Sequence, residues 1–88
     1  MSKISGTQVK AARALLNWSQ EDLAEKSCLT MTPISRMERE VVSTRKGTMK
    51  LIAMALEEVG IEFINEEGWV GVKLSLPHHQ NKSMAKKT

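Results

Sequence analysis

Positively charged side chains are concentrated in residues 30–50 of this 88-residue chain. Guanidinium and ammonium groups donate hydrogen bonds to anionic oxygens, so such a cluster is suited to holding a polyanion. Acidic residues gather elsewhere, in residues 57–67, which contain no basic side chain. This separation would orient a polyanion toward one side of the molecule, although charged stretches are also common on ordinary solvated surface. The basic stretch contains Arg36, Arg39, Arg45, Lys46 and Lys50 against Glu38 and Glu40.

The other reactive residue types do not assemble into a catalytic or metal site. Cys28 is the only cysteine, so the chain cannot form an internal disulfide, and no cysteine–histidine cluster has zinc-site spacing. The paired glutamates at 57–58 and 66–67 would point apart on a helix or into water near a turn. For His78 and His79 we favour a plain polar segment over metal binding. We therefore expect no enzyme activity, no metal and no cofactor.

Length and composition indicate one small domain. The chain is 41% hydrophobic with a formal net charge of +3, which is usual for a folded protein. Its 88 residues can support one modest core, but not two domains with a cleft between them. No apolar run approaches the roughly 18–20 residues of a membrane span, and the first residues lack the apolar stretch of a signal peptide. We expect a single cytoplasmic domain without a membrane partner.

A pattern that begins helices occurs three times near the N-terminus. Ser5, Ser19 and Thr30 each follow an apolar residue and precede another by four positions, as in an N-cap with a hydrophobic staple. Gln8 and Asp22 stand where a capping box needs a side chain that returns to the cap backbone. A fourth segment shows the apolar spacing of a helix. The predicted helices cover residues 7–16, 20–27, about 31–39 and about 46–59.

The third helix has two possible starts. It begins either at Met31 with Thr30 as its cap or at Pro33 with Thr32 as its cap, because proline disfavours helical geometry in the residue before it.

Residues 41–47 break the helical pattern and are predicted to form a basic loop. The apolar residues predicted to face inward from the four helices are Val9, Ala12, Leu15, Leu16, Leu23, Ala24, Ile34, Met37, Leu51, Ile52, Ala55, Leu56 and Val59.

The periodicity changes at Gly60, which we expect to end the fourth helix. Residues 61–64 are predicted to form a strand, 65–68 a turn, and 70–76 a second strand with one apolar face. A two-stranded hairpin is only marginally stable by itself, so it must pack on the helices or pair with another chain. We divide the chain into a helical domain at 1–60, a hairpin and possible dimerisation element at 61–76, and a disordered basic tail at 77–88.

Residues 20–39, QEDLAEKSCLTMTPISRMER, combine apolar and small residues as two short packed helices require. Leu23, Leu29, Ile34 and Met37 are apolar, while residues 24 and 27 are small. This stretch resembles the helix-turn-helix of the phage-repressor and Cro-like family, or XRE class. The resemblance extends over residues 5–56 and is strongest in AARALLNWSQEDLAE and ISRMER. It implies a mainly α, four- to five-helix repressor-like bundle with a C-terminal β-hairpin and a mobile basic tail; a helical hairpin without a DNA role is the alternative.

The resemblance implies a role for each exposed residue around the third helix. That helix would lie in the major groove, where Arg36 is the strongest base-reading candidate because a guanidinium can donate two hydrogen bonds to guanine. The alternative for Arg36 is a solvated or phosphate-bound side chain. The candidate base-reading residues are Met31, Thr32, Ser35 and Arg36. The candidate phosphate-binding residues are Gln20, Thr30, Arg39, Ser43, Thr44, Arg45 and Lys46.

Two further positions are interpreted through the same resemblance. Arg13 and Glu38 match positions that form an internal ion pair between the first and third helices, a structural role. Cys28 stands where the family usually has glycine, and in a left-handed backbone it would cost about 1–2 kcal/mol. We favour a small buried thiol that fills the turn over a redox sensor.

The sequence therefore predicts a sequence-specific transcriptional regulator that binds double-stranded DNA. A repressor that reads a palindromic operator as a homodimer is the favoured form, with the fourth helix and residues 70–76 as dimer surfaces. We interpret Trp18 as part of a hydrophobic staple and Trp69 as cover at the hairpin tip or a dimer contact. The alternatives are an antitoxin-like or adaptor module, which binds a protein through residues 57–67 and the hairpin, and an architectural protein that bends DNA without sequence preference.

Overall fold

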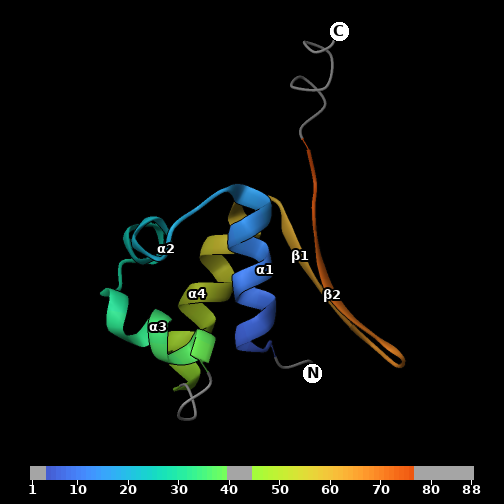
Figure 1. The fold of residues 1–88 in the computed structure, drawn as a ribbon, viewed down its shortest axis with the longest axis horizontal. Coiled ribbons are helices and arrows are strands. Elements are labelled where there is room, and N and C mark those ends of the chain that lie inside the picture. Colours follow the sequence, from blue (N-terminus) through green and yellow to red (C-terminus); the bar gives the residue numbers. More distant parts are fainter. Residues whose placement is uncertain (1–3, 40–44, 77–88) are drawn as a thin grey trace, which may run out of the picture.

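The computed structural model describes residues 4–39 and 45–76, which form four helices followed by an antiparallel two-stranded sheet (Figure 1). The predicted fold class, a mainly helical bundle with a C-terminal hairpin, is confirmed. The tail predicted at 77–88 and residues 41–44 of the predicted loop lie outside the described residues. The elements are α1 (Gly6–Leu16), α2 (Gln20–Ser27), α3 (Met31–Arg39), α4 (Lys46–Glu58), β1 (Ile61–Glu66) and β2 (Trp69–Leu74).

Helix α1 lies between the hairpin and the pair formed by α2 and α3. It contacts α3 and β2, whereas α2 contacts both α3 and α4. In Figure 1, α2 and α3 lie on the left and the hairpin extends to the right, with its tip projecting away from the helices. No helix in the described part of the chain is long and apolar enough to cross a membrane.

The first two helices begin with the capping boxes that the sequence predicts. The Ser5 hydroxyl accepts a hydrogen bond from the Gln8 backbone N–H at 3.2 Å, and the Ser5 N–H donates to the Gln8 side chain at 3.0 Å. Ser19 and Asp22 form the same reciprocal pair at 3.0 and 2.9 Å. Each box satisfies two N–H groups at the helix end that have no partner in the helix itself.

Helix α3 begins at Met31, so the alternative start at Pro33 is wrong. Pro33 is the third helical residue and lies in the first turn. The N–H groups of the first turn have no partner within a helix, and the missing N–H of proline therefore costs little there. The early start adds Met31 and Thr32 to the helix.

The core is built from one side of each helix and from the start of the hairpin. Val9, Leu23, Ile34, Ile52 and Leu56 are each fully buried. Two predicted core residues are wrong, because the side chains of Leu15 and Leu51 are 48% and 44% exposed. Each precedes an inward-facing residue by one position, which is about 100° around the helix. The buried stripes are narrower than the apolar spacing suggested.

The hairpin turn is tighter than predicted. β1 continues to Glu66, which pairs with Trp69, so only Glu67 and Gly68 connect the strands. Gly68 supplies the positive φ of +86° that such a turn needs. The predicted four-residue turn at 65–68 is therefore wrong, as is the extension of the second strand to residue 76, because β2 ends at Leu74.

Only part of the predicted apolar strand face is covered. Val72 and Leu74 pack against the core together with Phe63. Val70 is 70% exposed and Leu76 is 56% exposed. Val70 lies near the tip of the hairpin, which extends beyond the helices in Figure 1.

Gln8 joins the start of α1 to both strands of the hairpin. Its side chain is buried, and Nε2 donates to the backbone oxygens of Ile64 at 3.2 Å and Gly71 at 2.9 Å. These two residues are partners across the sheet. The same side chain also accepts from the Ser5 N–H, so one glutamine serves the helix cap and the hairpin.

Candidate nucleic-acid interface

The turn between α2 and α3 is set by a left-handed residue at Cys28. Its φ and ψ are 61° and 39°, and the N–H of the following Leu29 donates to the Ala24 oxygen at 2.8 Å. The expected left-handed backbone is thus present. The prediction of a buried thiol is wrong, because Cys28 is exposed and the half-buried Leu29 packs against the core at the turn instead.

Helix α3 has one side in the core and one side in solvent. Ile34 and Met37 are buried, while Thr32, Arg36 and Arg39 are exposed. The exposed side forms one wall of an open, shallow groove, and the first residue of α2 completes it. All four candidate base-reading residues and two of the phosphate-binding candidates are brought together here. The groove is lined by Gln20, Met31, Thr32, Ser35, Arg36 and Arg39.

The remaining phosphate-binding candidates do not line this groove. Thr30 is exposed just before α3, and Arg45 and Lys46 are exposed at the start of α4. Ser43 and Thr44 lie outside the described residues. The described candidates therefore lie in three places, which are the groove, the residue before α3 and the start of α4.

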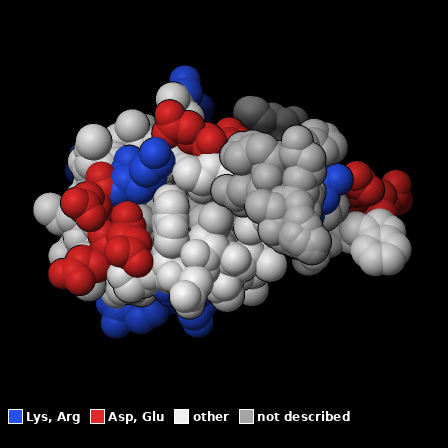
Figure 2. Space-filling model, turned by 90° about the horizontal axis from the view of Figure 1, so that it is seen from above, with Lys and Arg blue, Asp and Glu red and all other residues white. Residues whose placement is uncertain are grey.

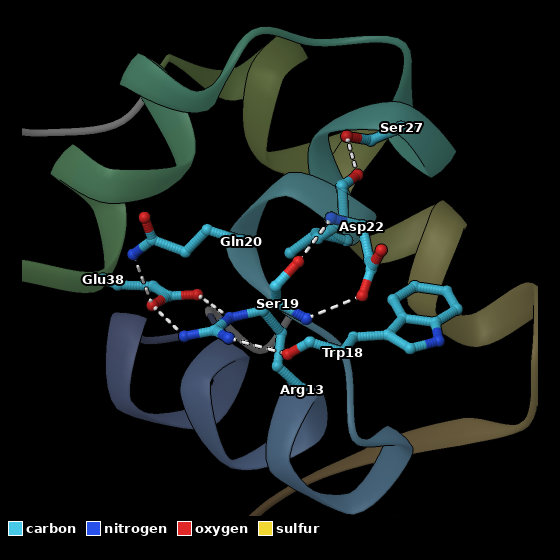
Figure 3. A network of polar contacts seen from close by, with 8 residues as sticks. Arg13, Trp18, Ser19, Gln20, Asp22, Ser27 and Glu38 are labelled. Carbon is cyan, nitrogen blue, oxygen red and sulfur yellow. Dashed lines mark hydrogen bonds and ion pairs between the residues drawn. The ribbon is translucent and has the colours of Figure 1, made fainter.

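An ion pair between α1 and α3 holds the inner side of the groove helix. Arg13 Nε and Nη2 contact the two carboxylate oxygens of Glu38 at 2.6 and 2.8 Å, and Nη1 donates to the Trp18 oxygen at 2.8 Å (Figure 3). The Glu38 side chain is only 1% exposed. The hydrogen bond to Glu38 raises the pKa of Arg13 above its usual value, against an opposing effect of burial. Arg13 therefore stays charged and paired.

Gln20 belongs to the same network, which the sequence analysis missed. Its Nε2 donates to Glu38 Oε1 at 3.1 Å, so this oxygen accepts from both Arg13 and Gln20 (Figure 3). Gln20 and Glu38 are 18 positions apart on different helices. Neither periodicity nor a local motif signals a contact at that separation.

A family model described as Helix-turn-helix matches residues 9–64 of the chain. This match covers more than half of the sequence, including the described parts of α2 to α4 and the groove. The chain belongs to the XRE-type helix-turn-helix family. It is therefore a DNA-binding transcription regulator of that type. No curated protein matches the chain.

The helix-turn-helix unit is held against α1 by a close backbone approach at Gly6. A Cβ atom at this position would lie 2.1 Å from the Met37 oxygen and 2.8 Å from the Glu38 Cα. Both distances are below any real carbon contact, so only glycine lets the start of α1 reach α3. Gly6 and the Arg13–Glu38 pair thus fix the helix-turn-helix from its inner side.

The helix-turn-helix regulator also separates charge over its surface. Acidic side chains gather over the end of the molecule at which α2 lies, and basic side chains form a separate group at the lower edge of the view in Figure 2. The acids of α2 include Glu21, Asp22 and Glu25, all exposed. Lys26 of the same helix pairs with Glu58 of α4 at 3.2 Å. The two arginines of α3, Arg36 and Arg39, line the groove.

Proposed function

We propose that this regulator is a repressor that binds a palindromic operator as a homodimer, with α3 of each subunit in the major groove. The observation that carries the proposal is the composition of the groove. A guanidinium, a thioether and two hydroxyl groups stand along one exposed side of α3, with Gln20 and Arg39 at the same groove. This arrangement combines groups that contact base edges with groups that contact the flanking backbone.

Arg36 carries most of the base discrimination in this proposal. It is exposed in the middle of the groove helix, and a guanidinium can donate two hydrogen bonds to guanine O6 and N7. Met31 is 44% exposed and offers an apolar contact, such as a thymine methyl group. Thr32 and Ser35 offer hydroxyl groups that suit either a base edge or a phosphate.

The phosphate contacts come from both sides of the groove helix. Gln20 is the first residue of α2, where the positive end of the helix dipole favours an anion. About five phosphate contacts per subunit would give a logarithmic salt slope near −9 for a dimer. The proposed phosphate-binding residues are Gln20, Thr30, Arg39, Ser43, Thr44, Arg45 and Lys46.

A homodimer supplies the specificity that one short helix lacks. Two-fold pairing would place two α3 helices about 34 Å apart, one turn of DNA, which requires a roughly palindromic site. Apolar side chains on α4 and the hairpin are available for such pairing. Leu51, Met54, Trp69 and Val70 are 44%, 54%, 72% and 70% exposed.

Selection of bound duplexes from a random pool tests the proposal directly. The expected result is one enriched motif made of two inverted half-sites whose centres are about one helical turn apart. Enrichment of a motif without symmetry would contradict the homodimer. Equal binding of all duplexes would favour the architectural alternative and contradict sequence-specific reading. Placement of the motif over a promoter, with lower reporter expression, then tests repression.

A second candidate is binding to another protein, as an antitoxin-like module does. The observation that favours it is the hairpin, where the exposed Trp69 and Val70 stand beside the exposed Glu66 and Glu67. An acidic tip is repelled by DNA and suits a basic protein surface. Light scattering after size exclusion, with and without DNA, distinguishes self-association from a complex with a second protein.

A further inference from the structure

The Gln20 side chain lies between the groove and a buried acceptor. Gln20 is the first residue of α2, it is half-buried, and it lines the groove together with the exposed residues of α3. Its amide nitrogen contacts Glu38 Oε1 at 3.1 Å, and the carboxylate of Glu38 is 1% exposed. Figure 3 shows the nitrogen of this amide toward Glu38 and its oxygen turned away. One side chain thus connects the interior of the domain with its proposed DNA surface.

A carboxylate at this place selects one of the two orientations of the amide. A glutamine amide can turn over and exchange its NH₂ group for its oxygen, and the two orientations offer opposite chemistry to a ligand. The ionised Glu38 only accepts hydrogen bonds, so the turned-over amide would place oxygen against oxygen. With one N–H of Nε2 directed to Glu38, the second N–H of the same nitrogen has a fixed direction.

The charge of Glu38 does not oppose DNA, because Arg13 neutralises it. Two guanidinium nitrogens contact the carboxylate at 2.6 and 2.8 Å, and the third is fixed by the Trp18 oxygen at 2.8 Å. Trp18 directly precedes Ser19, the cap of α2. The Arg13–Glu38 pair has no net charge, and it places a rigid carboxylate acceptor beside the first residue of α2.

We propose that Glu38 is a positioning residue for DNA binding, which holds the Gln20 amide so that an N–H, and not the oxygen, meets a backbone phosphate. The proposal rests on the proposed function, in which Gln20 contacts phosphate. Glu38 itself touches no DNA. It acts through Gln20, since it fixes the direction of that donor before the complex forms, and a pre-oriented donor loses less side-chain freedom on binding.

A double-mutant cycle on the full chain tests this proposal. The two substitutions Arg13→Met and Glu38→Met together remove the acceptor and its counter-charge, which a buried pair tolerates better than loss of one partner. Gln20→Met is then compared in the wild-type chain and in this double variant. The probe is a short duplex of random sequence at low salt, because a phosphate contact requires no operator. Lys46→Ala serves as the matched control, since Lys46 is outside the network.

We expect Gln20→Met to weaken duplex binding about five- to tenfold in the wild-type chain and less than about twofold in the double variant. Lys46→Ala should have the same effect in both. An equal effect of Gln20→Met in both backgrounds, or no effect in the wild type, overturns the positioning role but leaves the proposed function intact. Failure of the wild-type chain to bind any duplex overturns both.

Nuclear magnetic resonance of the wild-type chain gives a test that does not depend on the double variant folding. One proton of the Gln20 side-chain amide should be protected from solvent exchange by its bond to Glu38, and the other should exchange faster. Addition of the random duplex should shift the other proton and leave the first in place. Equally rapid solvent exchange of both protons in the free protein, or loss of the protection on DNA binding, would overturn the proposal.

Discussion

Arg36 and Lys46 represent two kinds of DNA contact at the scale of single residues. Arg36 lines the groove, whereas Lys46 is exposed at the start of α4. Arg36→Ala is expected to weaken binding to the selected operator about tenfold or more and to change binding to random duplex little. Lys46→Ala should weaken both about equally and reduce the salt slope by about one. Competition titrations at several salt concentrations measure these effects, and an unchanged preference in Arg36→Ala contradicts its base-reading role.

Cys28 carries a backbone cost that a smaller residue would remove. Its φ of 61° is one that residues with a side chain rarely adopt, apart from asparagine and aspartate. Cys28→Gly is expected to raise the free energy of unfolding by about 1 kcal/mol, measured by urea denaturation. Asn17 has nearly the same φ of 60°, at the end of α1. Asn17→Gly is the control and should raise the free energy of unfolding much less. Equal increases in the two variants would contradict a backbone cost specific to Cys28.

Single residues show clearly what the sequence can and cannot predict. The left-handed backbone at Cys28 followed from the family pattern. The family usually has glycine at this position, which indicates a backbone with positive φ. The exposure of its thiol did not follow, since it depends on Leu29 packing at the turn instead. The bond from Gln20 to Glu38 was also unpredictable, because it depends on how α2 and α3 meet in space.

At the scale of elements, the contact between α1 and α3 depends on the absence of one methyl group. Gly6→Ala would place a carbon 2.1 Å from the Met37 oxygen, so α1 would have to move away from α3. We expect a loss of about 1–3 kcal/mol in the free energy of unfolding and weaker DNA binding, because Glu38 moves with α3. Gly47→Ala is the matched control. A Cβ at Gly47 meets nothing within 4 Å, so alanine should stabilise α4 by about 0.5–1 kcal/mol.

Urea denaturation of both alanine variants decides this point. If Gly6→Ala is as stable as the wild type, the backbones of α1 and α3 are not in the close contact described above. Equal effects of the two substitutions would attribute both to helix propensity and none to packing.

A substitution at Gln8 can distinguish the contribution of the α1 cap to stability from that of the hairpin contact. Gln8→Glu keeps an acceptor for the Ser5 N–H, and glutamate suits this capping-box position. It removes the N–H groups that donate to Ile64 and Gly71 and places a negative charge near their oxygens. We expect Gln8→Glu to lower the free energy of unfolding by about 1–3 kcal/mol at neutral pH. The substitution should accelerate hydrogen exchange more in the hairpin than in α2.

The pH dependence of this variant provides its internal check. A buried carboxylate beside two carbonyl oxygens would have a raised pKa in the folded state. The loss of unfolding free energy should therefore be smallest in acid, where the protonated carboxyl group can donate a hydrogen bond. The loss should increase as the pH rises above the ordinary carboxyl range near 4. A pH-independent loss would assign the effect to packing and not to the missing donor.

The elements themselves were largely predictable from local chemistry, whereas their partners were not. The capping boxes at Ser5 and Ser19 marked two helix starts, because both participants lie within four residues. Leu15 and Leu51 were misplaced because an apolar residue at the border of a stripe is buried only if a neighbouring element covers it. The hairpin turn was placed too early, since the pairing of Glu66 with Trp69 depends on the register of both strands.

At the scale of the whole molecule, the two ends of the domain offer different surfaces. One end carries the groove, with Arg36 and Arg39 exposed beside Gln20. The other carries the hairpin, whose tip projects from the helices in Figure 1. Glu66, Glu67 and Trp69 are exposed at this tip. α1 contacts both α3 and β2, so it sets the position of one surface relative to the other. A partner that pairs through the hairpin would leave both grooves free for DNA.

The final prediction concerns the surface through which two copies pair. Trp69→Ser combined with Val70→Thr removes the exposed apolar tip of the hairpin, where the side chains are 72% and 70% exposed and contribute little to the core. If the hairpin is the dimer surface, this variant should dissociate at least about tenfold more readily in sedimentation velocity, and its affinity for the full palindrome should fall toward that for a half-site. Binding to a single half-site should not change.

Two further variants make the outcome decisive. Met54→Ser removes a side chain of α4 that is 54% exposed, and Leu15→Ser removes one of α1 that is 48% exposed. Dissociation caused by Met54→Ser alone would move the dimer surface to α4. Leu15→Ser should not change dissociation of the dimer, because α1 is not a proposed dimer surface. Equal dissociation in the hairpin variant, Met54→Ser and Leu15→Ser would indicate a general loss of stability. Monomers at every concentration of the wild-type chain would contradict the homodimer and favour a different protein as the hairpin's partner.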